Sequence, residues 1–213
     1  LARSLIVTPS VLLLDEPLSN LDALLREQMR VEIKRIQRSL GITAVYVTHD
    51  RVEAMSLSDR VIVMKDGKIR QIGAPDVIYE KPDSRFVAGF VGKAAFFPVT
   101  IGERKEGVWH CMLGDKVVHA RSAAPDIVKN SEGVLMARPE SLRLVDKGEG
   151  HLDGRVRMNV YLGHSLESYI QTAFGEVLVQ VDDPNARTIR KEGEEVSIEF
   201  PPDRVRLLGK SEE

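Results

Sequence analysis

The sequence predicts an α/β domain followed by a small all-β barrel. Residues 1–92 alternate between short apolar runs and segments with helical periodicity, which is the pattern of strands joined by crossover helices. Residues 95–208 instead show short alternating segments between turn residues, with no long helix. That pattern is typical of antiparallel barrels and sandwiches. We therefore expect two domains, residues 1–92 and residues 93–213, with a boundary near residue 93.

Composition allows two hydrophobic cores and argues against several classes of protein. Of 213 residues, 43% are hydrophobic, and the net charge is −2, which gives no electrostatic argument for nucleic-acid binding. The single cysteine, Cys111, excludes an internal disulfide and suits a reducing compartment. No apolar run approaches the roughly 20 residues that span a bilayer. We expect no secretory signal, and the start at Leu1 within a helical pattern suggests a fragment or a misplaced start.

A strand, a helix and a second strand are expected early in the first domain. Val11 to Leu14 is a continuous apolar run, as in a strand buried on both faces. Asp22 is the expected N-cap of the helix, and Gly41 is its expected stop. Thr43 to Thr48 predicts the second strand, parallel to the first across a right-handed crossover. The apolar face of the helix is formed by Leu25, Met29, Ile33, Ile36 and Leu40.

The remaining expected elements are short. Arg60 to Lys65 and Lys68 to Ile72 flank Asp66-Gly67, which is a strong signal for a two-residue hairpin turn. Ala74 to Glu80 and Ser84 to Val91 have the pattern of short helices. The strands expected in the second domain are Pro98–Ile101, Val108–Met112, Lys116–Ala120, Val134–Arg138, Arg155–Tyr161, Ser168–Thr172, Glu176–Val181, Glu195–Phe200 and Arg204–Leu208.

Polar side chains stand at the ends of both predicted parallel strands. Asp15 and Glu16 end the first strand, and His49 ends the second. Parallel strands end at one edge of a sheet, and in open α/β sheets this edge binds ligands. We expect Asp15 to hold Mg²⁺ on a nucleotide, directly or through water, because Mg²⁺ prefers oxygen ligands and keeps several waters. Glu16 could polarise an attacking water, and His49 could hydrogen-bond a γ-phosphate oxygen.

Each motif also has a purely structural interpretation. Asp-Glu-Pro after an apolar strand is often a solvated turn, and Thr-His-Asp at a strand end is often a capped loop. Here four apolar residues lead into Asp-Glu-Pro, followed by Ser-Asn-Leu-Asp and then by a helix and a strand that ends in Thr-His-Asp. This combination favours a functional site over coincidence.

With this combination, residues 1–92 resemble the second half of an ABC-type ATPase domain. Leu12 to Glu16 resembles the Walker B strand, with Glu16 as the catalytic carboxylate. Ser19 to Asp22 resembles the D-loop, which crosses the dimer interface, and His49 resembles the switch histidine. The stretch from Asp59 to Pro75 resembles the ending of importer ATPases for sugars and related solutes.

Residues 93–208 resemble the small OB-like β domain, called TOBE, that is appended to those ATPases. The segments Ala137-Arg138-Pro139-Glu140 and Tyr161-Leu162-Gly163 carry this looser part of the resemblance. The fold implied is an α/β partial P-loop ATPase domain followed by an all-β OB-like (TOBE) small barrel. The site residues implied are Glu16 and His49 for catalysis, Asp15, Ser19 and Asp22 for cofactor binding, and Asp15 for the metal.

The resemblance also implies cofactors, partners and a location. The cofactors are ATP and Mg²⁺, and the partners are a second copy in a homodimer and integral membrane permease subunits. The implied location is cytoplasmic, peripheral at the inner face of the cell membrane. A regulatory protein or a solute is implied as a partner of the β domain. No nucleic-acid partner is expected, because the β domain has no basic patch interleaved with aromatic residues.

The motifs that grip a nucleotide are not found in this sequence. A phosphate-binding loop needs Gly-x-x-x-x-Gly-Lys followed by Ser or Thr. The nearest segment, Gly92-Lys93, has Val87 in place of the first glycine and Ala94 in place of the hydroxyl residue. The family's Leu-Ser-Gly-Gly-Gln signature and glutamine loop are also absent. We therefore expect this chain alone to be inactive. Its α/β part should expose strand edges and apolar faces. We expect that part to be strained or rearranged, or to be covered by dimerisation.

Two features of the second domain have structural explanations. His110 and Cys111 are adjacent, which is poor spacing for metal ligands, so we expect one outward histidine and one buried cysteine. Arg138 and Glu140 flank Pro139, and we expect a structural role for them.

Three functions remain open. The first is the ATP-hydrolysing subunit of an ABC importer for sugars or related small solutes. In this case the intact protein, of which this chain would be a fragment, is an enzyme. The second is a non-catalytic regulatory or dimerisation module. The third, another ATPase of this superfamily in chromosome maintenance or repair, is disfavoured because no sustained heptads are present.

Overall fold

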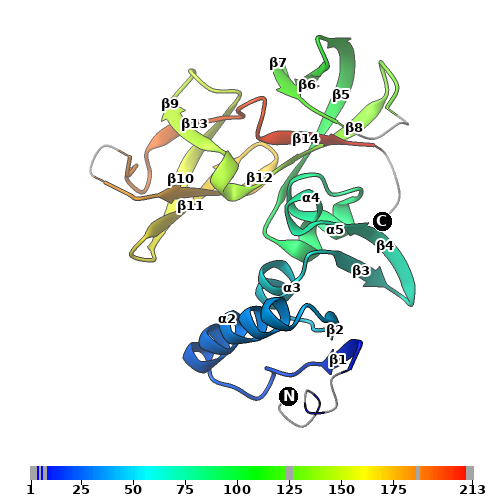
Figure 1. The fold of residues 1–213 in the computed structure, drawn as a ribbon. Helices are drawn as coiled ribbons and strands as arrows, with labels where there is room; N and C mark the ends of the chain where they lie inside the picture. The colour runs from blue at the N-terminus through cyan, green and yellow to red at the C-terminus, as the bar shows by residue number, and fades with distance from the viewer. Residues whose placement is uncertain (1–3, 5, 7–8, 123–126, 186–187, 210–213) are drawn as a thin grey trace. The chain divides into compact units, whose positions relative to one another are not determined.

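The computed structural model describes residues 4, 6, 9–122, 127–185 and 188–209. The chain divides into two compact units, Leu1–Glu80 and Lys81–Glu213, and Figure 1 shows the elements of each. The division falls before helix α5 (Arg85–Val91), whereas the sequence pattern changes near residue 93. The helical pattern expected from Leu1 lies largely outside the described residues.

The first unit begins with a parallel strand pair joined by a helix, as predicted. β1 (Val11–Asp15) pairs with β2 (Thr43–Val47) in a register that runs from Val11 opposite Thr43 to Asp15 opposite Val47. Helix α2 (Ala23–Leu40) connects them. The Asp22 side chain accepts a hydrogen bond from the Leu25 amide, and Gly41 ends the helix at φ 62°, in the left-handed region that favours glycine.

Helix α3 (Arg51–Leu57) was not predicted. Its N-cap is Asp50, whose side chain accepts hydrogen bonds from the amides of Val52 and Glu53. An acidic N-cap followed three residues later by glutamate is a helix-start signal that resembles a capping box. The sequence therefore contained a cue for this helix, which the Thr-His-Asp motif obscured.

The first unit continues with the predicted hairpin and a short helix. β3 (Val61–Lys65) and β4 (Lys68–Gly73) are antiparallel. Both turn residues have positive φ, 53° at Asp66 and 70° at Gly67, as expected for a two-residue hairpin turn. Helix α4 (Pro75–Glu80) follows and buries Ile78 completely.

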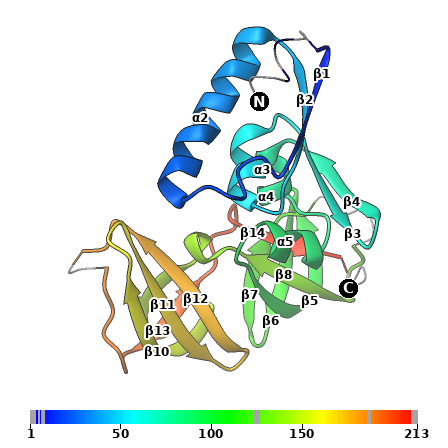
Figure 2. The same ribbon diagram turned by 90° about the horizontal axis from the view of Figure 1, so that it is seen from below.

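The second unit contains α5 and two five-stranded antiparallel sheets, ordered β14-β8-β5-β6-β7 and β12-β11-β10-β13-β9. Figures 1 and 2 show the two sheets side by side. The sequence pattern predicted every strand of these two sheets except β9. The bounds are β5 (Ala95–Lys105), β6 (Val108–Leu113), β7 (Lys116–Ala120), β8 (Glu132–Ala137), β9 (Arg143–Asp146), β10 (Leu152–Tyr161), β11 (Ser165–Thr172), β12 (Gly175–Asp182), β13 (Glu195–Glu199) and β14 (Val205–Leu208), with a 3₁₀ turn η1 at Pro139–Ser141.

The expectation of one small barrel needs refinement, because the strands form two sheets that share a core. The edges of the first sheet meet where the Leu207 amide donates to the Arg121 carbonyl at 2.9 Å. One buried apolar cluster contains side chains from both sheets. At its centre the rings of Phe97 and Phe200 pack edge to face, with centroids 5.0 Å apart. Aromatic contacts of this kind add to the burial energy and hold the two sheets together.

Arg138 has the structural role expected from the sequence. Its side chain is only 3% exposed. Nη1 donates hydrogen bonds to the carbonyl oxygens of Ala88, at 2.7 Å, and Lys93, at 3.0 Å. The guanidinium group thus satisfies carbonyls of α5 and of the segment that follows it, and fixes both against the end of β8.

His110 and Cys111 also match the structural explanation. Cys111 is buried, and burial raises its pKa to about 11. The His110 ring packs edge to face on His119 of β7, with centroids 4.5 Å apart. Within the described residues no group of three or more metal-binding side chains is found. No helix in the same part of the chain is long and apolar enough to cross a bilayer.

The shared core predicts a large effect of truncation at Phe200. We expect Phe200→Ala to lower the free energy of unfolding of the second unit by about 3–5 kcal/mol, because it removes a fully buried ring and leaves a cavity. Urea unfolding followed by circular dichroism measures the change. Val117→Ala, at an exposed position on β7, is the control and should change stability by about 0.5 kcal/mol or less. Equal effects of the two substitutions would contradict a shared core centred on Phe200.

Candidate functional site

The carboxyl edge of the parallel pair brings Glu16 and His49 together. The Glu16 amide donates to the Val47 carbonyl at 2.8 Å, which extends the pairing one residue beyond β1. Glu16 has φ 41°, a conformation that is uncommon for a residue other than glycine. The next contact is between side chains, with Glu16 Oε1 2.8 Å from His49 Nδ1. Two residues that are 33 positions apart in sequence therefore form one hydrogen-bonded pair.

The loop after β1 is fastened to the backbone of Glu16. The Ser19 hydroxyl donates to the Glu16 carbonyl at 2.9 Å, and the Ser19 amide donates to the same oxygen at 3.2 Å. Leu18 is buried and anchors the loop between them. Any movement of Ser19 is thus coupled directly to the residue that carries the candidate catalytic carboxylate.

The other two predicted site residues are Asp15, which directly precedes Glu16, and Asp22, which lies further along the chain. Asp15 is exposed at the end of β1. Asp22 Oδ1 accepts from the Leu25 amide at 2.9 Å, so its carboxylate caps α2. The structure therefore brings Glu16, His49 and Ser19 together, and gives Asp22 a structural partner.

Hydrogen bonding to Glu16 and the charge of its carboxylate raise the pKa of His49 above its ordinary value. His49 is 75% exposed and Glu16 is 46% exposed, so solvent screens the pair. The bond engages Nδ1 of the imidazole. An ionised carboxylate only accepts, so Nδ1 donates, and Nε2 can donate to a further group only when the ring is protonated. The raised pKa therefore favours the form of His49 that could bind an anion.

The turn that carries His49 is held by residues that sequence reasoning missed. The Asp50 amide donates to Thr48 Oγ1 at 3.0 Å and closes the turn around His49. Thr48 Oγ1 in turn donates to Glu53 Oε2 at 2.7 Å. Glu53 is 2% exposed and also accepts from the Tyr46 hydroxyl at 3.2 Å. The glutamate of α3 thus holds the end of β2, and its place three residues after Asp50 was the available signal.

Arg26 connects this turn to α2. Its Nη1 lies 3.4 Å from Asp50 Oδ2, and Nη2 donates to the Leu21 carbonyl at 3.0 Å. Partial burial opposes ionisation of Asp50, but the amides of Glu53 and Val52, together with Arg26, lower its pKa. Burial, followed by the charge of Glu53, raises the pKa of Tyr46. These interactions keep Asp50 ionised and Tyr46 neutral, and position the turn.

The oxygen donors at this edge fit a metal that keeps its own waters. No cage of three or more metal-binding side chains occurs among the described residues. Asp15 and Glu16 offer exposed carboxylates at the end of β1. Mg²⁺ commonly binds through one or two carboxylates together with phosphate oxygens and waters. The residues present therefore suit Mg²⁺ held on a nucleotide.

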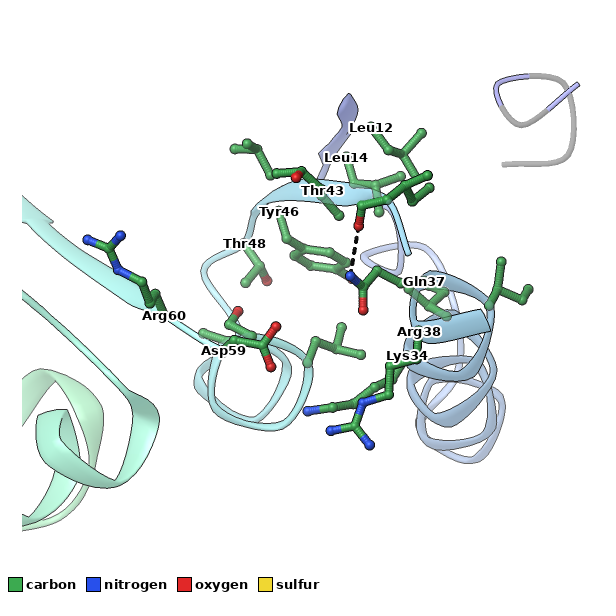
Figure 3. Close-up of a pocket in the computed structure, with 18 of the residues that line it drawn as sticks. Leu12, Leu14, Lys34, Gln37, Arg38, Thr43, Tyr46, Thr48, Asp59 and Arg60 are labelled. Atoms are coloured by element: carbon green, nitrogen blue, oxygen red, sulfur yellow. Dashed lines mark hydrogen bonds between the residues drawn. The ribbon is translucent and has the colours of Figure 1, made fainter. Parts of the chain in front are cut away.

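A cavity of about 660 Å³ lies in the first unit between β2 and the start of β3 (Figure 3). Tyr46 and Thr48 line it from β2 and the turn, Asp59 and Arg60 line it near β3, and Gln37 lines it from α2. In the described residues β2 pairs only with β1, and β3 pairs only with β4. The predicted exposure of strand edges and apolar side chains is therefore present, for example at Leu13 of β1, which is 74% exposed.

Comparison with known proteins found a family match in the second unit and relatives along most of the chain. Residues 135–208 match the family described as the TOBE domain. The homologues of the chain are ATP-binding subunits of importers. The chain spans about half the length of the curated relatives that it matches.

Three relatives illustrate the similarity. The spermidine/putrescine import ATP-binding protein PotA of Borreliella afzelii is 38% identical over 99% of this chain and 57% of its own length. The Fe(3+) ions import ATP-binding protein FbpC of Rhizobium etli is 45% identical over 84% of this chain and 50% of its own length. The Escherichia coli FbpC is 40% identical over 95% and 55%. Among solved structures, the cytoplasmic molybdate-binding protein ModG is 19% identical with a TM-score of 0.45, over 53% of this chain and 94% of that chain.

The Glu16–His49 pair predicts a measurable shift in the His49 titration. Glu16→Gln should lower the pKa of His49 toward its ordinary value, because it removes the carboxylate charge. Since the folded pKa is raised, the stabilising contribution of the pair is present below the unfolded pKa of His49 and is lost as pH rises through its folded pKa. NMR titration of the His49 ring measures the shift. The control is Glu27→Gln, because the Glu27 carboxylate is not among the groups that shift the pKa of His49. An unchanged titration in the Glu16→Gln variant would disprove the pairing in solution.

Proposed function

We propose that this chain carries the water-handling half of the ATP hydrolysis site of an ABC importer subunit, which couples hydrolysis to the uptake of a small solute. The observation that carries the proposal is the 2.8 Å pair of Glu16 and His49 at the carboxyl edge of two parallel strands. The homologues, which are importer ATP-binding proteins, support the same class.

Each site residue has a proposed role in this reaction. Glu16 accepts a proton from the attacking water or polarises it. His49, oriented through Nδ1 by Glu16, donates from Nε2 to an oxygen of the γ-phosphate. Asp15 holds Mg²⁺ directly or through water. Bound Mg-ATP supplies the phosphoryl group and the charge that the metal neutralises.

Ser19 and Asp22 have supporting roles in the proposed mechanism. Ser19 connects the loop after β1 to the Glu16 backbone, so a subunit or nucleotide that contacts this loop also acts on Glu16. Asp22, which caps α2, holds the far end of the same loop. A homodimer in which this loop meets the nucleotide of the partner subunit is part of the proposal.

We place the residues that hold the nucleotide phosphates outside these 213. The sequence contains no Gly-x-x-x-x-Gly-Lys-Ser/Thr segment, and this segment would donate the amides and the lysine that hold the β- and γ-phosphates. The cavity between β2 and β3 is where we place an additional strand of the same protein, because both bordering strands lack a described partner on that side.

We propose a small solute as the transported molecule and name no particular one. Relatives of comparable identity have names that specify spermidine and putrescine in one case and Fe(3+) ions in the other. These relatives therefore point to no single solute for this chain, and they give a sugar no support. We place selectivity in membrane permease subunits and associated proteins, with the ATPase subunit bound at the cytoplasmic face of the membrane.

The second unit supports a second role, that of a regulatory module. It has its own buried core, and most of it lies within the match to the TOBE domain. A non-catalytic chain of this kind would bind a regulatory protein, a solute or a second copy through the β unit. The two roles differ in whether Glu16 and His49 take part in ATP turnover by the complete protein.

Substitution of Glu16 tests the catalytic proposal in the complete ATPase that carries the phosphate-binding loop. Glu16→Gln should lower ATP turnover by roughly a hundred- to ten-thousand-fold, because it removes the base while keeping the shape of the side chain. Binding of Mg-ATP should be retained. Phosphate release and fluorescent-nucleotide binding measure the two quantities, with Glu27→Gln on α2 as the matched control. Unchanged turnover would reject the role of Glu16.

Calorimetry with Mg-ATP on the 213-residue chain tests whether the nucleotide can be held without a phosphate-binding loop. We expect no binding in the micromolar range, because the donors for the β- and γ-phosphates are missing from the sequence. Micromolar binding would show that this chain holds the nucleotide without that loop, and would favour catalysis by the chain itself.

A further inference from the structure

A second concave surface lies in the first unit, between α2 and α3. This groove has a volume of about 490 Å³. Arg30, Lys34 and Arg38 line it from α2, and Val52 and Leu57 line it from α3. None of the residues assigned to ATP hydrolysis lines it, so the groove is separate from the Glu16–His49 pair.

The groove is strongly basic, although the whole chain has a net charge of −2. Arg30, Lys34 and Arg38 are spaced four residues apart, so they follow one side of α2, and Arg35 is beside them. Glu27 is the only carboxylate among the described residues that line the groove. Figure 3 shows Lys34 and Arg38 reaching from α2 along one rim of the neighbouring cavity, which they also border.

The cations of the groove differ in how far they are already engaged. Lys34 Nζ donates to the Ser56 carbonyl at 2.6 Å, and Arg35 pairs with Glu32 at 2.6 Å. In the described part of the chain, Arg30 and Arg38 form no ion pair within 4.0 Å. The charge of Arg30 also helps to lower the pKa of Asp50. Both guanidinium groups can still bind carboxylates, for which their planar geometry is suited.

The groove also has an apolar lining. Val31 of α2 is 56% exposed and Val52 of α3 is 57% exposed, and Leu57 lies half-buried beside them. A single exposed valine is common on a protein surface. Here one valine from each helix lines the same groove, so an occupant with apolar side chains would bury both.

We propose that this groove binds an acidic amphipathic segment of a partner protein. The apolar side of the segment packs against Val31, Val52 and Leu57, and its carboxylates pair with Arg30 and Arg38. Charge complementarity requires a negative occupant, and the apolar lining requires an amphipathic one. The surface is concave, which a flat bilayer does not match. Among the described lining residues there is no aromatic side chain on which nucleic-acid bases could stack. The proposal does not depend on ATP hydrolysis.

The test uses the 213-residue chain and a labelled model peptide. The probe is a fluorescein-labelled amphipathic helix of about four turns, with leucines on one face and glutamates on the other. A counterpart with lysines in place of the glutamates controls for charge. Fluorescence anisotropy should show saturable binding of the glutamate peptide alone, weakening as NaCl rises from about 0.05 M to about 0.3 M.

Variants locate the binding. Arg30→Glu with Arg38→Glu should weaken binding about tenfold or more, because two attractive charges become repulsive. Lys68→Glu with Arg70→Glu, at exposed positions on β4, makes the same change in net charge outside the groove and should leave binding unchanged. Val31→Ser with Val52→Ser should also weaken it, which a purely electrostatic attraction would not predict. Circular dichroism confirms that each variant is folded.

Three results would overturn the proposal. The first is equal binding of the lysine peptide, and the second is an equal loss in the β4 variant. The third is that vesicles of anionic phosphatidylglycerol, or a single-stranded oligonucleotide, bind the chain while the glutamate peptide does not. In that case the basic groove serves a lipid surface or a nucleic acid.

Discussion

The parallel pairing of β1 with β2 is the constraint on which the site depends. The two strands pair in parallel from Val11 opposite Thr43 to Asp15 opposite Val47, so both end at the same edge of the sheet. The Glu16 amide then bonds to the Val47 carbonyl and fixes the position of the next turn. An antiparallel pairing would have placed the acid and the histidine at opposite ends. The 2.8 Å contact between their side chains is thus a consequence of strand direction and helix crossover, which any alternative pairing would lose.

Charge inside the first unit is used mainly to hold its turns. Asp22 and Asp50 both cap helices, and Glu53 is buried against the hydroxyls of Thr48 and Tyr46. A buried carboxylate is costly unless it has partners, and here it accepts hydrogen bonds and lies near Arg26. Glu16 and His49, in contrast, interact where water reaches both. The first unit therefore combines a rigid, partly buried support with an exposed pair of titratable groups.

Local patterns predicted most helices and strands of both units, but not how the strands of the second unit pair. The two parallel strands, α2 and the β3–β4 hairpin follow from apolar runs, caps and the Asp66-Gly67 turn, which all act within a few residues. The pairing of β5 with β8, and of β8 with β14, is set by contacts distant in sequence, so two sheets could not be distinguished from one barrel. In the site, the sequence is compatible with Asp22 either as a helix N-cap or as a residue that contacts the nucleotide. The structure shows the capping role, because the Leu25 amide donates a hydrogen bond to its carboxylate.

The contrast in burial between the units bears on how such a chain works. In the second unit apolar side chains of both sheets converge in one core around Phe97 and Phe200. In the first unit Leu13 is 74% exposed, and β2 and β3 border a cavity without a described strand between them. Apolar surface of this kind is stabilised when further chain covers it. Covering it would fix the edge that carries Glu16 and His49, so assembly of the sheet would also align the two residues of the proposed site.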